Sequence, residues 1–286
     1  MSTLVTGTSG RLGRHVVKAL LARGARPASI VATARNVAAI AELTSFGVRT
    51  AELDYNRPDT IESALHDVDA VLLVSSSEMG NRVAQHRNVI EAAVKAGVSK
   101  LVYTSAPRAT TSPLVVNPEH KGTEETIAEL GVPAVILRNG WYTENYAQHL
   151  AYAAQTGILV ASAGAGRVAS ASRIDYAEAA AVVLLEDGHV GSVYELAGDV
   201  AWDFQELAAA MSEVLGRPVQ YTPLTTEEHL AALQAAGLDP ALAGFLTAVD
   251  ANIRDGLLAV TDGTLSRLIG RPTTPLVDGL RAINAG

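Results

Sequence analysis

The alternation of short apolar runs with helical stretches constrains the fold of this 286-residue chain most strongly. Six apolar runs of strand length cover residues 2–7, 29–34, 48–53, 69–77, 100–105 and 133–140. Between them lie five stretches with helical character, at residues 11–24, 36–47, 57–68, 81–97 and 118–131. Parallel strands need crossover helices, and right-handed crossovers place those helices on both faces of the sheet. The pattern therefore predicts an α/β fold with a doubly wound parallel sheet.

The composition and the pattern of the sequence change after Gly140. Residues 141–157 are rich in aromatic side chains, although aromatics make up only 5% of the chain. Residues 191–198 read as one more strand, and the chain from Trp202 onward is mostly helical with a short strand at 219–224. We expect two domains: residues 1–140 plus 174–198 form the sheet domain, and 141–173 plus 199–286 form a smaller, mostly helical C-terminal cap. Such sheets bind ligands at the carboxyl ends of their strands, which is where the cap would sit.

Three glycines follow the first strand at every third position, Gly7, Gly10 and Gly13. A strand, a glycine-rich turn and a helix in this order are the context of a dinucleotide-binding fingerprint. Gly7 would permit the tight turn, Gly10 would let a pyrophosphate approach the backbone, and Gly13 would allow close packing of helix on strand. The spacing G-x-x-G-x-x-G is looser than G-x-G-x-x-G, and a turn that serves packing alone is the alternative. Together with the alternating pattern, it predicts an NAD(P)-binding Rossmann fold.

Arg35 ends the second strand, where an NAD-binding protein carries an acidic residue for the ribose hydroxyl. A guanidinium suits a 2′-phosphate, so the cofactor predicted is NADP(H), unless Arg35 is only a solvated charge. Asp54 follows the third strand and would either meet the adenine or stabilise a turn. Ser75, Ser76 and Ser77 end the fourth strand and would either line the nicotinamide ribose or cap the next helix.

Charge and composition exclude several classes of function. The net charge is −8 at pH 7, which argues against nucleic acid and anionic membranes as partners. The chain has no cysteine, so thiol catalysis and disulfides are excluded. No compact metal-ligand spacing occurs, and no apolar run approaches membrane-spanning length. With no basic, apolar leader at residues 1–7, we expect a cytoplasmic protein.

Several longer stretches carry a resemblance to a known family. They are "TGTSGRLG", "LLVSSSEMGNR", "QHRNVIEAA", "YTSA", "LRNGWYTENY", "ASASRIDYA", "VYELAGD" and "LIGRPTTPL", of which "LRNGWYTENY" with "ASASRIDYA" is the most specific. The sequence resembles the NmrA-like branch of the atypical short-chain dehydrogenase/reductases and, within it, the NAD(P)H:quinone oxidoreductase 2 type. The resemblance implies a two-domain protein that binds NADPH in a cleft and reduces quinones without flavin or metal.

The resemblance also implies roles for individual residues. Pyrophosphate contacts would come from Gly7, Thr8, Ser9, Gly10, Arg11 and Leu12. Arg35 would meet the 2′-phosphate, and Ser75 to Ser77 would line the ribose. The nicotinamide side would be closed by Gly140, Trp141, Tyr142, Thr143, Glu144, Asn145 and Arg173. Other members of the wider group carry a lysine where His120 falls, so a lysine-based mechanism is in doubt; His120 is a candidate catalytic residue, or simply part of a charged first helical turn with Glu119 and Lys121.

Short-chain dehydrogenases usually carry Tyr-x-x-x-Lys, whose tyrosine donates a proton to the reduced carbonyl. None of the eight tyrosines here has a lysine four residues on. Reduction of a ketone leaves an alkoxide about as basic as hydroxide, whereas reduction of a quinone leaves a much less basic, phenoxide-like anion whose conjugate acid has a pKa of about 10. The missing pair therefore favours quinone reduction. Trp141 and Tyr142 would wall the quinone, unless they are core residues, and Asn145 would donate to the developing oxyanion.

The prediction is an NAD(P)H-dependent quinone oxidoreductase that transfers hydride directly from NADPH to a quinone. The competing hypothesis is a non-catalytic NADP(H)-sensing regulator of the NmrA type. The partners predicted are a small-molecule quinone, with no nucleic acid and no membrane, and a homodimer is left open.

Overall fold

The computed structural model describes residues 1–285, and these divide into two compact units that we treat separately. The first unit comprises Met1–Thr110, Val116–Asn139 and Arg173–Glu195. The second comprises Thr111–Val115, Gly140–Ser172 and Leu196–Gly286. The boundaries differ from the predicted ones by up to three residues, and the short segment Thr111–Val115, expected in the sheet domain, groups with the second unit.

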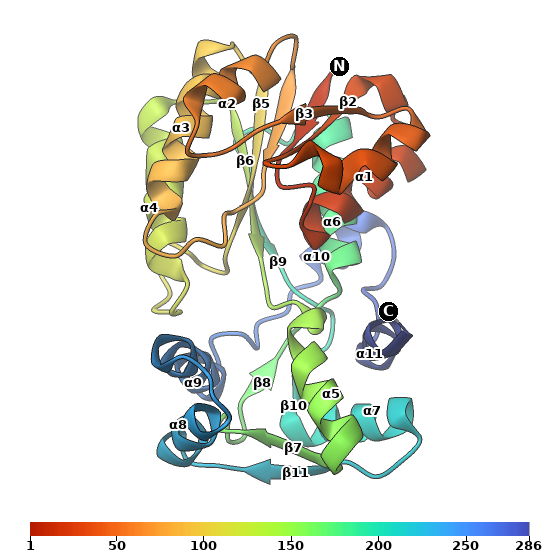
Figure 1. Ribbon diagram of the computed structural model, residues 1–286, viewed down its shortest axis with the longest axis vertical. Helices are drawn as coiled ribbons and strands as arrows, with labels where there is room; N and C mark the ends of the chain where they lie inside the picture. Colours follow the sequence, from red (N-terminus) through yellow and green to blue (C-terminus); the bar gives the residue numbers. More distant parts are fainter. Residues whose placement is uncertain (286) are drawn as a thin grey trace. The chain divides into compact units, whose positions relative to one another are not determined.

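A seven-stranded sheet in the order β3-β2-β1-β4-β5-β6-β9 forms the centre of the first unit (Figure 1). The strands are β1 (Thr3–Val5), β2 (Ile30–Ala34), β3 (Arg49–Glu52), β4 (Ala70–Leu73), β5 (Lys100–Ser105), β6 (Ala134–Asn139) and β9 (Val193–Leu196). Every pairing from β3 to β6 in that order is parallel. This is the doubly wound order of a Rossmann fold, so the fold predicted from the sequence is confirmed.

Helices cover both faces of this sheet. They are α1 (Arg11–Ala22), α2 (Pro58–Ala64), α3 (Arg82–Lys95), α4 (Asn117–Leu130) and α6 (Arg173–Leu185), with a short 3₁₀ turn η1 (Pro27–Ser29). In Figure 1, α2, α3 and α4 lie on one side of the sheet and α1 packs beside α6 on the other. Because the strands are parallel, their carboxyl ends all lie at one edge of the sheet, and those of β1, β2 and β4 are neighbours there.

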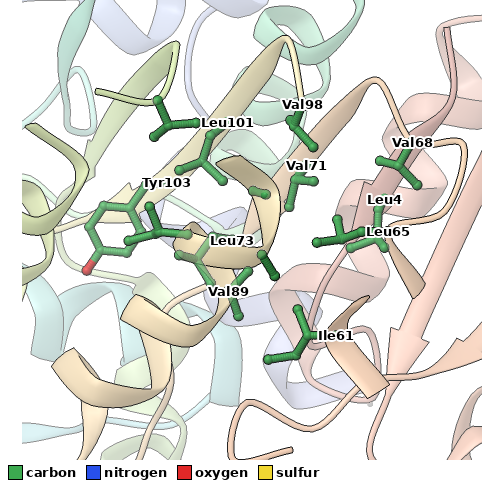
Figure 2. Close-up of a cluster of buried hydrophobic side chains, with 14 of the residues drawn as sticks. Leu4, Ile61, Leu65, Val68, Val71, Leu73, Val89, Val98, Leu101 and Tyr103 are labelled. Carbon is green, nitrogen blue, oxygen red and sulfur yellow. The ribbon is translucent and has the colours of Figure 1, made fainter. Parts of the chain in front are cut away.

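A cluster of buried aliphatic side chains lies between the sheet and α2, α3 and α4 (Figure 2). Leu4, Val71, Leu73, Leu101 and Tyr103 supply its sheet side. Strands β1, β2, β4 and β5 are buried along their whole length, which is why they read as continuous apolar runs in the sequence, whereas β3 is partly exposed. Tyr103 brings the one hydroxyl shown in Figure 2 into this apolar layer.

The segment after β2 departs from the prediction. Residues 36–47 were expected to be an α-helix, but Val37–Phe46 (η2) forms consecutive 3₁₀ turns. The hydroxyls of Thr44 and Ser45 donate to the carbonyls three residues earlier, at Ala41 and Glu42. These side-chain bonds lie in the last turns of the segment and match the three-residue spacing of 3₁₀ turns.

The second unit is mostly helical with two small sheets. Strand β7 (Ile158–Ala161) pairs in parallel with β11 (Gln220–Pro223), and β8 (Arg167–Val168) pairs antiparallel with β10 (Trp202–Asp203). The helices are η3 (Thr143–Tyr146), α5 (Ala147–Thr156), α7 (Phe204–Leu215), α8 (Thr226–Ala235), α9 (Pro240–Arg254), α10 (Thr264–Ile269) and α11 (Leu276–Ala285). The sequence predicted β11 but not β7, β8 or β10. Strands β8 and β10 are only two residues long, too short for a recognisable pattern, whereas β7 is an apolar run, Ile158–Ala161, that the prediction missed.

Gly13 sets the distance between α1 and the loop after β1. A Cβ atom at Gly13 would lie 2.6 Å from the carbonyl oxygen of Gly7 and 2.9 Å from that of Thr6. Because both neighbours are backbone, neither can move aside without shifting α1. The packing role predicted for Gly13 is confirmed.

We expect Gly13→Ala to lower the free energy of unfolding by about 1–3 kcal/mol, the cost of overpacking a fixed contact. Gly244 in α9 offers a matched control, because a Cβ atom there meets nothing within 4 Å. Gly244→Ala should raise the free energy of unfolding by about 0.5–1 kcal/mol, since alanine is the better helix former. Urea unfolding of both variants measures the difference, and equal midpoints would contradict the packing role.

Candidate functional site

The turn between β1 and α1 has the shape that the three glycines predict. Gly7 lies in the left-handed region at φ +62°, and its carbonyl accepts the N–H of Gly10 at 3.0 Å. The same carbonyl oxygen lies 2.6 Å from the position that a Cβ atom would take at Gly13. A residue with a side chain would be strained at this φ, so the tight-turn role of Gly7 is confirmed.

The first amides of α1 are open to an anion. Gly10 is the N-cap residue, and among residues 1–285 no side chain caps the helix and no acidic residue stands in its first turn. The first N–H groups of a helix have no partner within the helix, and their dipole favours negative charge. Uncapped amides next to an exposed Ser9, Gly10 and Arg11 fit the pyrophosphate of a dinucleotide.

Two residues of this loop, Thr8 and Leu12, have buried side chains. Thr8 is fully buried, and its N–H and its hydroxyl both donate to the carbonyl of Thr33 at 2.9 Å. Leu12 is buried in the core beneath α1. Neither side chain faces solvent, so Thr8 and Leu12 fix the loop, and any contact from them to a pyrophosphate would come from the backbone.

Arg35 stands immediately after β2 with 70% of its side chain exposed. Its Nη1 donates to Oε1 of Glu78 at 3.0 Å, and Glu78 comes from the loop after β4. Arg35 therefore has an ion-pair partner while most of its side chain stays in solvent, and its role at a 2′-phosphate stays a prediction. Asp54 accepts the N–H of Asn56 at 2.9 Å, which is the turn role weighed for it.

The loop of Ser75, Ser76 and Ser77 is held in place by neighbouring side chains. The N–H of Ser75 donates to Thr104, the N–H of Ser76 donates to Nε2 of His86, and Nε of Arg82 donates to the carbonyl of Ser76 at 2.7 Å. Helix α3 begins later, at Arg82, with Asn81 as its N-cap residue. The alternative that these serines cap the helix is therefore wrong, and their role at the ribose stays a prediction.

His86 on α3 is a residue of this region that the sequence did not single out. Burial, together with the charges of His120 and Arg82, lowers the pKa of His86 to about 3, so the ring is neutral. Its Nε2 accepts from Ser76, so its proton sits on Nδ1 and points at the hydroxyl of Thr123, 2.9 Å away. Thr123 in turn donates to the carbonyl of Glu119 at 2.9 Å. The motif "QHRN" on a helix that faces the fourth strand was the only sequence signal for it.

His120 on α4 is buried, which differs from the charged first helical turn considered for it. Its Nδ1 lies 2.8 Å from the hydroxyl of Tyr103. Burial, reinforced by the charge of Arg82, lowers the pKa of His120 to about 3. At neutral pH, His120 is therefore an uncharged ring and not a cationic acid.

Ser105, at the end of β5, donates its hydroxyl to Oε1 of Glu124 at 2.6 Å. Glu124 is also bound by Arg138, whose Nη2 lies 2.6 Å from Oε2. The hydroxyl thus contributes to an ion pair of the first unit.

In the second unit, the segment Gly140–Asn145 is fixed against residues 169–172. Thr143 donates its N–H to the carbonyl of Ala171 at 2.9 Å, and Ala171 donates its own to Trp141 at 3.1 Å. The hydroxyl of Ser172 donates to Glu144 at 3.1 Å. Trp141, Tyr142 and Asn145 are half-buried, and Asn145 stands in η3. The two most family-specific stretches of the sequence are thus paired in space.

Comparison with known proteins identifies the family. The model of the NmrA-like family matches residues 2–251. The chain belongs to the NmrA-like family. It is 44% identical to quinone oxidoreductase 2 of Escherichia coli (strain K12) over 276 residues, which cover 96% of each protein. The crystal structure of NADPH-dependent quinone oxidoreductase from Escherichia coli in complex with NADPH superposes with a TM-score of 0.93 at 43% identity, covering 100% of this chain and 99% of that one. The triphenylmethane reductase of Citrobacter sp. complexed with NADP(H) gives a TM-score of 0.92 at 35% identity, covering 99% and 100%.

Within this NmrA-like chain, the remaining predicted residue, Arg173, opens helix α6 of the first unit and is half-buried. No group of three or more histidine, cysteine, aspartate or glutamate side chains within residues 1–285 could hold a metal ion. Across the same residues, no helix is long and apolar enough to span a membrane.

A buried serine, histidine and aspartate in the second unit resemble a hydrolytic triad only in composition. Oδ2 of Asp250 lies 3.0 Å from Nδ1 of His229, and Oγ of Ser162 lies 3.2 Å from the same nitrogen. In a relay, the acid and the serine meet opposite ring nitrogens. Asp250 also accepts the N–H of Ser162 at 2.6 Å, so the cluster ties α8 and α9 to the end of β7.

The buried histidines predict how stability depends on pH. His86 and His120 have pKa values of about 3 in the folded chain, against 6.5 for an unperturbed histidine. Below pH 6.5 the unfolded chain gains protons that the folded chain does not, so stability is full above pH 6.5 and is lost as the pH falls toward 3. Each histidine contributes a slope of about 1.4 kcal/mol per pH unit.

Two variants test how much His86 contributes to the pH dependence of stability. His86→Gln keeps an acceptor near the Nε2 position and removes the titrating group, so the slope in urea unfolding between pH 7 and pH 5 should decrease. His86→Asn places its amide near the Nδ1 position and leaves the N–H of Ser76 without its acceptor, which should lower stability at pH 7 by about 1–3 kcal/mol. An unchanged slope in His86→Gln would contradict the neutral, buried state of the ring.

Proposed function

We propose that this chain is an NADPH-dependent quinone oxidoreductase that binds the nucleotide on its first unit. The observation that carries the proposal is the turn Gly7–Gly13, with a left-handed Gly7 and uncapped amides at the start of α1. Arg35 stands at the end of the neighbouring strand, where a 2′-phosphate would lie. The relative at 44% identity is named for quinone reduction, which supports the choice of substrate class.

The residues of the first unit bind and orient the nucleotide in this proposal. The amides that open α1 hold the pyrophosphate, Gly10 lets it approach, and Arg35 binds the 2′-phosphate. The loop Ser75–Ser77, held by His86 and Arg82, lines the ribose. When bound, NADPH supplies a hydride from its nicotinamide ring.

The chemistry that remains for the protein is modest. A reduced quinone carries an anion of pKa about 10, which a hydrogen-bond donor or water can stabilise. A strong acid of the Tyr-x-x-x-Lys type is therefore not needed. His120 is neutral and cannot act as a cationic acid, and its Nδ1 lies 2.8 Å from the hydroxyl of Tyr103. Any role that it has in the reaction is that of a neutral hydrogen-bonding ring.

We assign the positioning of the quinone to Gly140–Asn145 of the second unit. Trp141 and Tyr142 would hold the flat ring, and the side-chain amide of Asn145 would donate to the developing oxyanion. The hydrogen bonds of Thr143 to Ala171 and of Ser172 to Glu144 support this role, because they make the segment rigid before a ligand binds.

A substrate panel tests the proposal. The native protein is supplied with NADPH and, in separate assays, with quinones, aldehydes and ketones, and NADPH oxidation is followed by absorbance. We expect turnover with quinones and little with the carbonyl compounds. Binding of NADPH without turnover of any quinone would overturn the proposal in favour of an NADP(H) sensor.

A further inference from the structure

The carboxylate that the sequence lacks after β2 is supplied by the loop after β4. Glu78 lies in the loop after β4, yet its Oε1 accepts from Nη1 of Arg35 at 3.0 Å. An acid at the end of β2 is what proteins use to bind the ribose 2′-hydroxyl of NAD. An arginine there suits the 2′-phosphate of NADP. The structure thus places both groups at the position that discriminates between the two nucleotides.

Glu78 is held in place from its other side. Nε2 of Gln85 donates to Oε2 of Glu78 at 2.6 Å and to Oδ1 of Asn56 at 3.3 Å. Gln85 itself is buried, with 3% of its surface exposed. The carboxylate therefore has one oxygen anchored on α3 and one on Arg35, and departure of Arg35 to a phosphate would leave the first anchor intact.

We propose that Glu78 sets the nucleotide selectivity of this chain by competing with the 2′-phosphate for Arg35. This inference rests on the proposed function in that it takes Arg35 as the phosphate-binding residue. The phosphate carries a charge of about −1.5 to −2 at pH 7, and a fixed carboxylate beside it weakens its attraction to the guanidinium. The same carboxylate accepts the 2′-hydroxyl of NAD. Glu78 thereby makes the affinity for NADP(H) exceed that for NAD(H) by less than Arg35 alone would.

The expected effect is moderate because both side chains are partly exposed. The exposed fractions are 70% for Arg35 and 39% for Glu78, so solvent screens the pair. We expect Glu78→Gln to tighten NADP⁺ binding by about 3- to 10-fold and to weaken NAD⁺ binding by about 2- to 5-fold. The glutamine keeps an acceptor for Gln85 and removes only the charge.

Calorimetric titration with NADP⁺ and with NAD⁺ at fixed ionic strength measures the ratio of the two dissociation constants. Glu129→Gln is the matched control, because Glu129 also pairs with an arginine, Arg87 at 2.7 Å, but lies at the far end of α4. The ratio should change in Glu78→Gln and not in Glu129→Gln. In an Arg35→Ala background, Glu78→Gln should no longer tighten NADP⁺ binding, since the competition needs both partners.

The outcomes separate this inference from the proposed function. A native protein that binds both nucleotides, with a ratio that Glu78→Gln leaves unchanged, overturns the role of Glu78 and leaves the proposed function standing. Tightening of NADP⁺ in Glu78→Gln that persists in the Arg35→Ala background also overturns it. A native protein that binds neither nucleotide overturns both.

Discussion

Arg35→Asp is expected to weaken NADPH binding by about 2–3 kcal/mol, which is roughly 30- to 150-fold in the dissociation constant. The substitution deletes a charge-assisted contact and places a second carboxylate beside Glu78, whose Oε1 accepts from Arg35 in the native chain. Both carboxylates then repel the 2′-phosphate. Isothermal titration with NADPH measures the loss, and binding of NADH should change much less.

Arg26→Asp is the control for this variant. Arg26 is exposed and precedes β2, so it lies at the opposite end of the strand from Arg35. The two variants change the net charge equally. Only Arg35→Asp, at the carboxyl end of β2, should weaken binding of the 2′-phosphate. Equal NADPH affinities in the two variants would show that Arg35 does not bind the 2′-phosphate.

Asn145→Ala is expected to lower kcat for quinone reduction by about 10- to 1000-fold, where loss of a preorganised donor to an oxyanion elsewhere costs about 100- to 1000-fold. Asn145→Asp makes the sharper comparison, because it keeps the shape of the side chain and replaces its N–H donor by a carboxylate. We expect at least the same loss in that variant. Steady-state assays at saturating NADPH give kcat, and titration should show NADPH binding within about threefold of the native value.

Gln148→Ala serves as the control, since Gln148 is exposed on α5, three residues beyond Asn145. Its kcat should match that of the native protein. Full activity in Asn145→Asp would remove Asn145 from the chemistry and leave the segment Gly140–Asn145 with a purely structural role.

Local pattern was sufficient to predict the sheet of the first unit. Strands β4 and β5 are buried on both faces and appear in the sequence as largely apolar runs. Gly7 and Gly13 mark the turn between β1 and α1. The failures lie in irregular or very short segments. Residues 37–46 form 3₁₀ turns in which the hydroxyls of Thr44 and Ser45 bond to carbonyls three residues earlier, and β8 is only two residues long.

The candidate site was harder to predict, because its decisive contacts join residues far apart in the sequence. Glu78 reaches Arg35 across 43 positions, and His86 lies 37 positions from Thr123. The positions of these residues along the sequence do not indicate that they are in contact. Burial was likewise hidden at His120 and Thr8, which read as polar residues of exposed segments and lie inside the first unit.

Initial-rate kinetics, with NADPH and a quinone varied against each other, test most directly whether the nucleotide reduces the quinone without a carrier. Hydride transfer needs reacting atoms about 3–3.5 Å apart, so both ligands must be bound at once. The chain has no cysteine that could store electrons between two half-reactions. We expect intersecting reciprocal plots and one hydroquinone formed for each NADPH consumed. Parallel plots, or a flavin that copurifies with the active protein, would contradict direct transfer.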